Sequence, residues 1–141
     1  MRLSRHTDYA LRVLIHLAAA PDRLSSIAEI ARAYDISQNH LMKVVNQLAR
    51  ADLVKTVRGR GGGIALARPA EDIIIGTVVR LTEPDHNLAD CGTCLIAPAC
   101  GLISPLDEAL RAFLAVLDRY SVADAAARKR DLANLLGLAV A

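Results

Sequence analysis

Residues 37–51 are SQNHLMKVVNQLARA, a stretch that divides into two opposite faces of one helix. Apolar side chains recur at the i, i+3, i+4, i+7 spacing that packs on a core, namely at Leu41, Val44, Val45 and Leu48. Polar side chains recur on the other face, at Asn39, Lys43, Asn46 and Arg50. Ser37 is a favoured N-cap residue. We therefore predict an amphipathic helix from Ser37 to about Ala51, with amides and cations facing outward.

The preceding residues predict two more helices. One runs from Ser26 to about Tyr34 and starts with Ser26 and Glu29, which have the spacing of a capping box. A short turn, Asp35-Ile36-Ser37, then leads into the amphipathic helix. An earlier helix is predicted from about Thr7 to Ala20, where Pro21 stops it. Two helices joined by a tight turn, the second with a polar outer face, are what a helix-turn-helix requires.

Residues 53–67 are LVKTVRGRGGGIALA, two short β-prone runs around a glycine-rich turn. This pattern predicts a β-hairpin, and a hairpin directly after a DNA-reading helix is the wing of a winged helix. Arg58 and Arg60 would lie at its tip, where arginine suits phosphates and a narrow minor groove. Glycine lets the backbone approach another surface closely. The predicted DNA-binding residues are Ser37, Gln38, Asn39, His40, Lys43, Asn46, Arg58, Arg60, Gly61 and Gly62.

Charge is divided along the chain. The formal net charge is +2, but residues 1–68 hold 11 Lys/Arg and 5 Asp/Glu, whereas residues 69–141 hold 6 and 10. A basic first half beside an acidic second half suggests that the first half meets a polyanion, although small domains also show such imbalance by chance. No apolar run approaches the roughly 20 residues that cross a bilayer, and we expect a soluble, cytoplasmic protein without a membrane partner.

The second half predicts a helix, a loop and a longer helix. The helix runs from about Ile75 to Leu81, and the loop from Glu83 to Ala99. Ser104-Pro105 is a favoured start for the longest helix. Its apolar residues are spaced 4, 3, 4, as in a helix that packs on another helix: Leu106, Leu110, Phe113 and Leu117. We expect this seam to hold a homodimer; the alternative is packing on its own domain.

The predicted fold is mainly α with a small β-hairpin: a winged helix-turn-helix domain plus a long dimerisation helix. Its predicted parts are a DNA-binding domain in residues 1–82, a cluster-binding loop in residues 83–103, and a dimerisation and C-terminal helical segment in residues 104–141.

All three cysteines fall in the loop, as Cys91-x2-Cys94-x5-Cys100. An odd, clustered set argues against a disulfide scaffold. Three soft thiolates in one loop can bind an iron–sulfur cluster or zinc, or remain reduced thiols. A four-ligand centre would need another ligand, because the chain has no fourth cysteine. That ligand could be a histidine, a carboxylate, an exogenous molecule or a residue of a partner subunit.

The chain resembles the winged-helix iron–sulfur regulators of the NsrR type, nitric-oxide-sensing bacterial repressors whose wider family includes the cluster-assembly regulator IscR. The resemblance covers nearly the whole chain. It rests on RHTDYALR at residues 5–12, SQNHLMKVVNQL at residues 37–48, VRGRGGGI at residues 57–64, and three cysteines before a long helix. Each motif alone is weak, but the set is specific.

The resemblance implies a homodimeric repressor of a palindromic DNA operator. It further implies a 4Fe–4S cluster, with 2Fe–2S as the second choice, held by Cys91, Cys94, Cys100 and the partner subunit's Asp8. Nitric oxide would then release the DNA and derepress nitric-oxide detoxification genes. The plainer explanation of Asp8 is a carboxylate favoured in the first turn of a helix. A regulator that senses redox or iron–sulfur status through 2Fe–2S or zinc is the alternative.

Two departures from the family pattern matter. The first cysteine gap is shorter than usual in the family, so Cys91 is the least secure ligand. Ile103 occupies the position where IscR-like members have a ligating histidine. An enzyme is not expected, because the chain has no nucleophile-elbow or phosphate-loop motif.

Overall fold

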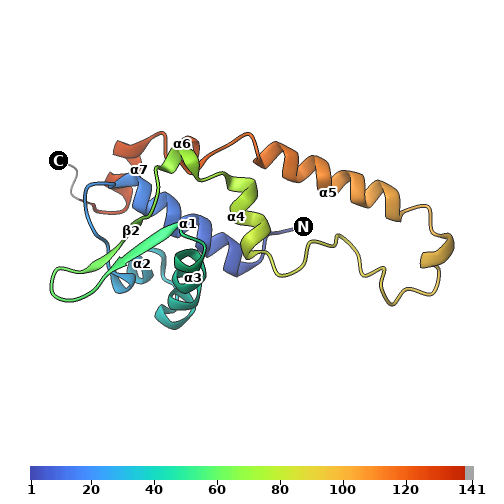
Figure 1. Cartoon of the computed structure of the whole chain (residues 1–141), viewed down its shortest axis with the longest axis horizontal. Coiled ribbons are helices and arrows are strands. Elements are labelled where there is room, and N and C mark those ends of the chain that lie inside the picture. The colour runs from blue at the N-terminus through green and yellow to red at the C-terminus, as the bar shows by residue number, and fades with distance from the viewer. Residues whose placement is uncertain (139–141) are drawn as a thin grey trace.

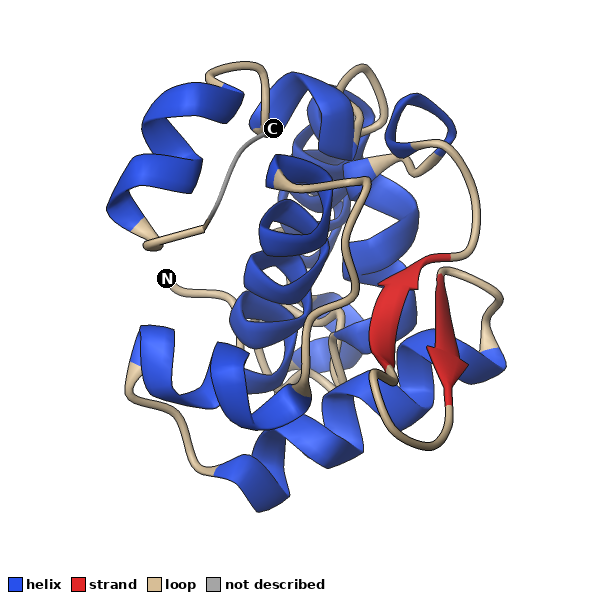
Figure 2. Cartoon of the chain, turned by 90° about the vertical axis from the view of Figure 1, so that its left-hand side faces the viewer, coloured by secondary structure: helices blue, strands red, loops and turns tan. Residues whose placement is uncertain are grey.

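The computed structural model describes residues 1–138 as a largely helical body with one helix extending from it (Figure 1). The helices are α1 (Arg5–Ala19), α2 (Ile27–Tyr34), α3 (Gln38–Arg50), α4 (Ile75–Thr82), α5 (Ile103–Leu117), α6 (Val122–Ala125) and α7 (Lys129–Leu135). Two 3₁₀ turns cover Ala70–Asp72 and Ala97–Ala99. The strands are β1 (Val54–Val57) and β2 (Gly63–Leu66). Figure 2 shows this small sheet at the edge of the helical body.

Helix α1 is the centre of the core. Val13 and Leu14 are fully buried, and α3, α4, α6 and α7 pack against this helix, whereas α2 packs on α3. The predicted inner face of α3 is confirmed, because all four of its apolar residues are buried, namely Leu41, Val44, Val45 and Leu48. Together these helices and the hairpin form the winged helix that the sequence predicts.

Serine side chains cap the starts of α1 and α2, but the capping box predicted for α2 is only half formed. Ser4 caps α1 by accepting from the Thr7 N–H, so the helix starts earlier than predicted. Ser26 caps α2 by accepting from the Glu29 N–H at 3.0 Å. The Glu29 carboxylate does not return the bond as a capping box would. It instead forms an ion pair with Arg23 at 2.7 Å, because a guanidinium is the stronger partner for a carboxylate.

The start of α5 also differs from the prediction. The helix begins at Ile103, with Leu102 as its N-cap residue and no side-chain cap. Ser104 therefore lies inside the first turn. Pro105 is tolerated there, because the first-turn N–H groups have no intrahelical acceptor. Within the described residues, α5 shares the greatest helix length with α1, since each has 15 residues.

The hairpin is antiparallel, with Val54 opposite Leu66 and Val57 opposite Gly63. Ser25, just before α2, forms two backbone hydrogen bonds with Ile64, at 3.1 and 2.8 Å. The base of the hairpin is therefore tied to the start of the helix-turn-helix, which fixes where its turn projects.

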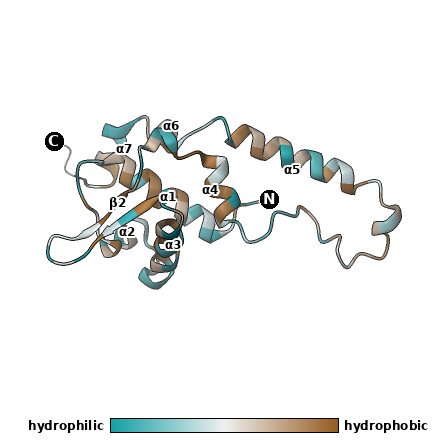
Figure 3. Cartoon of the chain, viewed as in Figure 1, coloured by the Kyte–Doolittle hydropathy of each residue, from teal (hydrophilic) through white to brown (hydrophobic). Residues whose placement is uncertain are grey.

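After α5 the chain returns to the body. Val122 and Ala133 are fully buried, and α6 and α7 both pack against α1. Helix α5 itself extends away from the body, with the segment before it running alongside (Figure 1). Figure 3 shows apolar and polar residues interspersed along α5. Within residues 1–138, no helix is long and apolar enough to cross a membrane.

A candidate DNA-binding face and cysteine loop

The outer face of α3 presents exposed polar side chains. Gln38, Asn39, Lys43 and Asn46 are all exposed. Ser37 is exposed as well, but its hydroxyl caps α3 by accepting from the His40 N–H at 3.4 Å. The residues predicted to read base edges or phosphates are therefore accessible from outside the protein, on a helix whose other face is anchored in the core.

His40 differs from the other residues of this face because its ring packs on α1. The ring lies edge-on to Tyr9, with centroids 4.8 Å apart, and stacks on His6 at 5.9 Å. Desolvation lowers the pKa of His40, and His6, Lys43 and Arg5 lower it further by repulsion. His40 thus joins the start of α3 to α1 in electropositive surroundings.

Sequence reasoning did not assign a role to Gln47, which connects three helices. Its side-chain amide donates from Nε2 to the Leu81 carbonyl in α4 at 2.8 Å. Its Oε1 lies 2.6 Å from His6 Nε2 in α1. Since the carbonyl requires a donor, the amide orientation is fixed, and His6 must carry a proton on Nε2 to donate to Oε1. The sequence signal that could have identified Gln47 is its position as a polar residue among the apolar positions of α3.

The hairpin turn carries Arg58 and Arg60, both exposed. Its geometry depends on glycine: Gly61 has a φ of 69°, and the Gly62 N–H donates to the Gly59 carbonyl at 3.0 Å. A Cβ on Gly62 would overlap the Val57 carbonyl oxygen. The turn is therefore tight, and it holds both arginine side chains at the surface.

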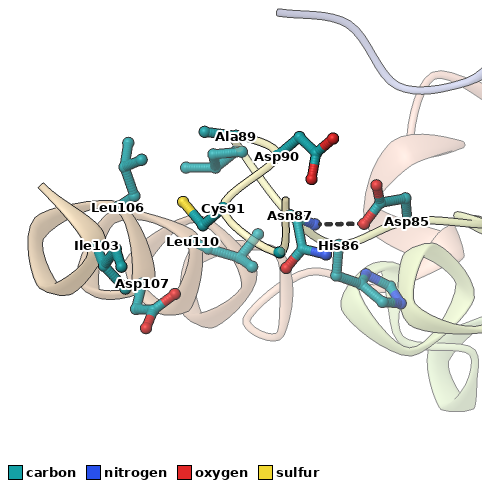
Figure 4. A pocket seen from close by; sticks show the side chains of 12 residues that line it. Asp85, His86, Asn87, Ala89, Asp90, Cys91, Ile103, Leu106, Asp107 and Leu110 are labelled. Carbon is teal, nitrogen blue, oxygen red and sulfur yellow. Dashed lines mark hydrogen bonds between the residues drawn. The ribbon is translucent and has the colours of Figure 1, made fainter. Parts of the chain in front are cut away.

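The three cysteines lie between α4 and α5 as free thiols. Cys91 and Cys100 are half-buried and Cys94 is exposed. Short backbone hydrogen bonds shape the loop: the Ala97 N–H donates to Cys94 O at 3.2 Å, and the Cys100 N–H to Ala97 O at 3.3 Å. Cys91 lines a cavity of about 360 Å³ between the loop and α5 (Figure 4). The same cavity is lined by Asp85, Asp90, Asp107 and His86.

The donor set suits an iron–sulfur cluster, since three reduced thiols share one loop and soft thiolates select such centres. Residues 1–138 nevertheless bring no three His, Cys, Asp or Glu side chains together as a ready metal site. The loop would have to close further for all three sulfurs to meet one centre.

Asp8 lies apart from the cysteines in this chain. It lines a different cavity, with Arg2, Tyr9 and Tyr34. Its carboxylate forms an ion pair with Arg12 at 2.8 Å, and its side chain is 44% exposed. The carboxylate is therefore accessible to another molecule.

The predicted dimer seam runs along α5. Leu106, Leu110 and Leu117 are half-buried, Phe113 is exposed, and within the described chain no residue of α5 is fully buried. Leu110, Phe113 and Leu117 line an apolar groove of about 470 Å³, together with Leu3 and Val79 of the body.

Comparison with known proteins identifies relatives over nearly the whole chain. A family model described as "Rrf2: Iron-dependent Transcriptional regulator" matches residues 3–128. The HTH-type transcriptional regulator NsrR of Bacillus subtilis (strain 168) is 52% identical over 142 residues, covering 96% of this chain and 97% of that protein. The NsrR of Shouchella clausii (strain KSM-K16) is 45% identical, covering 96% of this chain and 95% of that protein.

Solved structures agree with this result. The oxidised form of Staphylococcus aureus CymR matches with a TM-score of 0.73 at 30% identity, over 89% of this chain and 96% of that one. T. potens IscR matches with a TM-score of 0.72 at 27% identity, over 88% and 85%. The predicted winged-helix fold and the resemblance to NsrR-type regulators are both confirmed, and the relatives are transcriptional regulators rather than enzymes.

Proposed function

The chain belongs to the Rrf2 family of transcriptional regulators, and we propose that it is a homodimeric repressor whose cysteine loop holds an iron–sulfur cluster that responds to nitric oxide. The observation that carries the proposal is the placement of two different surfaces on one chain. An exposed polar helix face and hairpin belong to the body, whereas three free thiols lie in the loop between α4 and α5. Helix α5 extends away from the body (Figure 1).

The DNA-binding part of the proposal rests on α3 and the hairpin. Helix α3 would enter the major groove, where exposed Gln38, Asn39 and Lys43 can reach base edges or phosphates. Arg58 and Arg60 would contact the backbone or the neighbouring minor groove. The excess of basic residues in the first half of the chain would favour association with DNA before any specific contact forms.

The sensing part rests on the loop. Cys91, Cys94 and Cys100 would hold the cluster, with the partner subunit's Asp8 as the fourth ligand. The cluster would supply a centre with which nitric oxide reacts. In this chain, the exposed Cys94 and the accessible Asp8 carboxylate support a site that is completed between two subunits.

Dimerisation would connect the two parts. A dimeric helix-turn-helix protein must hold its recognition helices about one DNA turn apart, roughly 34 Å. The groove between α5 and the body has the apolar residues that a second copy of α5 would cover. A contact between the cysteine loop of one subunit and Asp8 of the other would then favour one arrangement of the dimer, as coupling between two sites requires.

Anaerobic native mass spectrometry, combined with DNA-binding measurements before and after nitric oxide, tests the proposal. We expect a brown dimer with one cluster per subunit that binds a palindromic duplex and releases it after nitric oxide. A 2Fe–2S mass would overturn the assigned cluster type and favour the redox or iron–sulfur-status alternative. A colourless, zinc-loaded protein under strict anaerobiosis would contradict the cluster itself.

Two variants assign the ligands. Asp8→Ala should leave the protein folded but make cluster loss faster. Asp22→Ala, which removes an exposed carboxylate beyond the other end of α1, is the matched control and should retain wild-type cluster stability. If Asp8→Ala retains wild-type cluster stability and nitric-oxide response, Asp8 does not belong to the site.

A further inference from the structure

Helix α5 is joined to the rest of the protein mainly at its C-terminal end. Its first residue follows Cys100 by three positions, and the helix extends away from the body (Figure 1). Asp118, directly after Leu117, is its C-cap residue. The orientation of α5 relative to the winged helix therefore depends on the packing of Leu114 and Leu117 on the core and on the contacts around Asp118.

Asp118 forms a two-pronged ion pair with Arg80 of α4. Arg80 Nη1 donates to Oδ1 at 2.6 Å, and Nη2 to Oδ2 at 2.7 Å. Parallel bonds of this kind fix the relative orientation of both groups as well as their distance. The hydrogen bonds from Arg80 hold the pKa of Asp118 below its ordinary value.

Gly76 gives the Asp118 carboxylate room to reach α4. A Cβ on Gly76 would overlap Oδ1 of Asp118. Two backbone hydrogen bonds hold the same junction: the Ile75 N–H donates to Tyr120 O at 2.9 Å, and the Val122 N–H donates to Ile73 O at 2.8 Å. The start of α4 and the end of α5 are thus joined by side-chain and backbone contacts at one point, which we call the α4–α5 junction (Gly76, Arg80 and Asp118).

We propose that the α4–α5 junction sets the separation of the two DNA-reading helices in the dimer, with Arg80 and Asp118 as positioning residues that determine which half-site spacing the protein accepts. This inference rests on the proposed function. A 15-residue helix is about 22 Å long, so a tilt of about 10° between α5 and the body displaces the body relative to the far end of α5 by about 4 Å. In a dimer held together through α5, the same tilt moves each DNA-reading helix relative to its partner. One base-pair step is about 3.4 Å, so even a small tilt changes the match to a given spacing.

The test uses duplexes selected by the wild-type dimer from a random pool, with the spacer between half-sites then changed by one or two base pairs. Asp118→Asn retains the shape of the side chain but loses its charge. Arg80→Lys retains the charge but cannot span both oxygens. We expect both variants to reduce the ratio of affinities between the best spacer and its neighbours at least threefold. Asp131→Asn, which breaks the exposed Arg128–Asp131 pair of α7, should leave the ratio unchanged.

A second measurement does not need DNA. Hydrogen exchange at the Ile75 and Val122 amides should become about threefold faster in Asp118→Asn, and not in Asp131→Asn. An equal loss of affinity on every spacer would show a merely structural role and overturn the proposal, as would an unchanged ratio. If the wild type selects no duplex, the proposed function fails. Unchanged hydrogen exchange in Asp118→Asn would then also show that the Arg80–Asp118 ion pair does not hold the α4–α5 junction.

Discussion

Replacing Gln47 with Ala should destabilise the protein without removing any group from the DNA-binding face. The substitution removes the hydrogen bonds to Leu81 O and His6 Nε2. A hydrogen bond contributes about 0.5–1.5 kcal/mol net, so losing two from a half-buried site costs about 2 kcal/mol. For a domain of this size, that loss lowers the melting temperature by about 6 °C. The Leu81 carbonyl, at the end of α4, would also lose its partner in α3.

Urea unfolding measures the stability of the variant, and fluorescence anisotropy measures its affinity for operator DNA. Asn46→Ala is the matched control, because Asn46 is the adjacent residue of α3 and is exposed. That variant should be as stable as the wild type, or more stable by up to about 0.5 kcal/mol, because alanine is the better helix former. It should nevertheless bind DNA about tenfold more weakly if Asn46 reaches a base edge. A wild-type unfolding midpoint for Gln47→Ala would refute the role of Gln47 as the link between three helices.

Three further predictions concern the core and the wing. Burial lowers the folded-state pKa of His16, so below about pH 6.5 the unfolded chain binds more protons than the folded one. The free energy of unfolding should therefore fall as the pH drops toward the folded-state pKa. His16→Phe should remove this dependence, and an equal pH slope in both proteins would contradict the prediction. Arg60→Ala should weaken DNA binding and reduce the salt slope by about one, whereas an unchanged slope would exclude a phosphate contact. Gly62→Ala should cost about 1–3 kcal/mol of local strain and weaken DNA binding, because a Cβ there overlaps the Val57 carbonyl; wild-type affinity would show that the turn is not used.

The winged helix could be predicted from the sequence because its determinants are local. The apolar spacing in α3 fixes which face is buried, and the glycines between Val57 and Ile64 fix a turn. It was harder to predict from the sequence which of two possible partners a side chain binds. Glu29 pairs with Arg23 instead of completing the capping box, since the alternative partner comes from outside the helix. The start of α5 was misplaced because the Ser-Pro pattern also fits inside a first turn.

The candidate site was less predictable than the fold because its contacts join distant parts of the chain. Gln47 to Leu81 and Arg80 to Asp118 span 34 and 38 positions. No periodicity marks such pairs, and each residue alone resembles an ordinary surface side chain. The cysteine spacing indicates which donors are available, but not how the loop arranges them, because short turns around Ala97–Ala99 decide that locally.

The surroundings of Asp8 leave its carboxylate available for the ligand role proposed for it. Its partner within the chain is Arg12, one turn along α1, and both side chains are more than 40% exposed. Arg12 Nε also donates to Oδ1 at 3.1 Å, but an exposed pair one helical turn apart contributes only about 0.3–0.5 kcal/mol, so the carboxylate can leave Arg12 at little cost. Arg12 would still have neighbours that stabilise its charge, because its guanidinium lies 5.9 Å from the ring centres of both Tyr9 and Tyr34. A cation over aromatic rings is stabilised without a carboxylate. The chain thus holds Asp8 through a contact weak enough to be exchanged, as the ligand role proposed for it in a partner subunit's site requires.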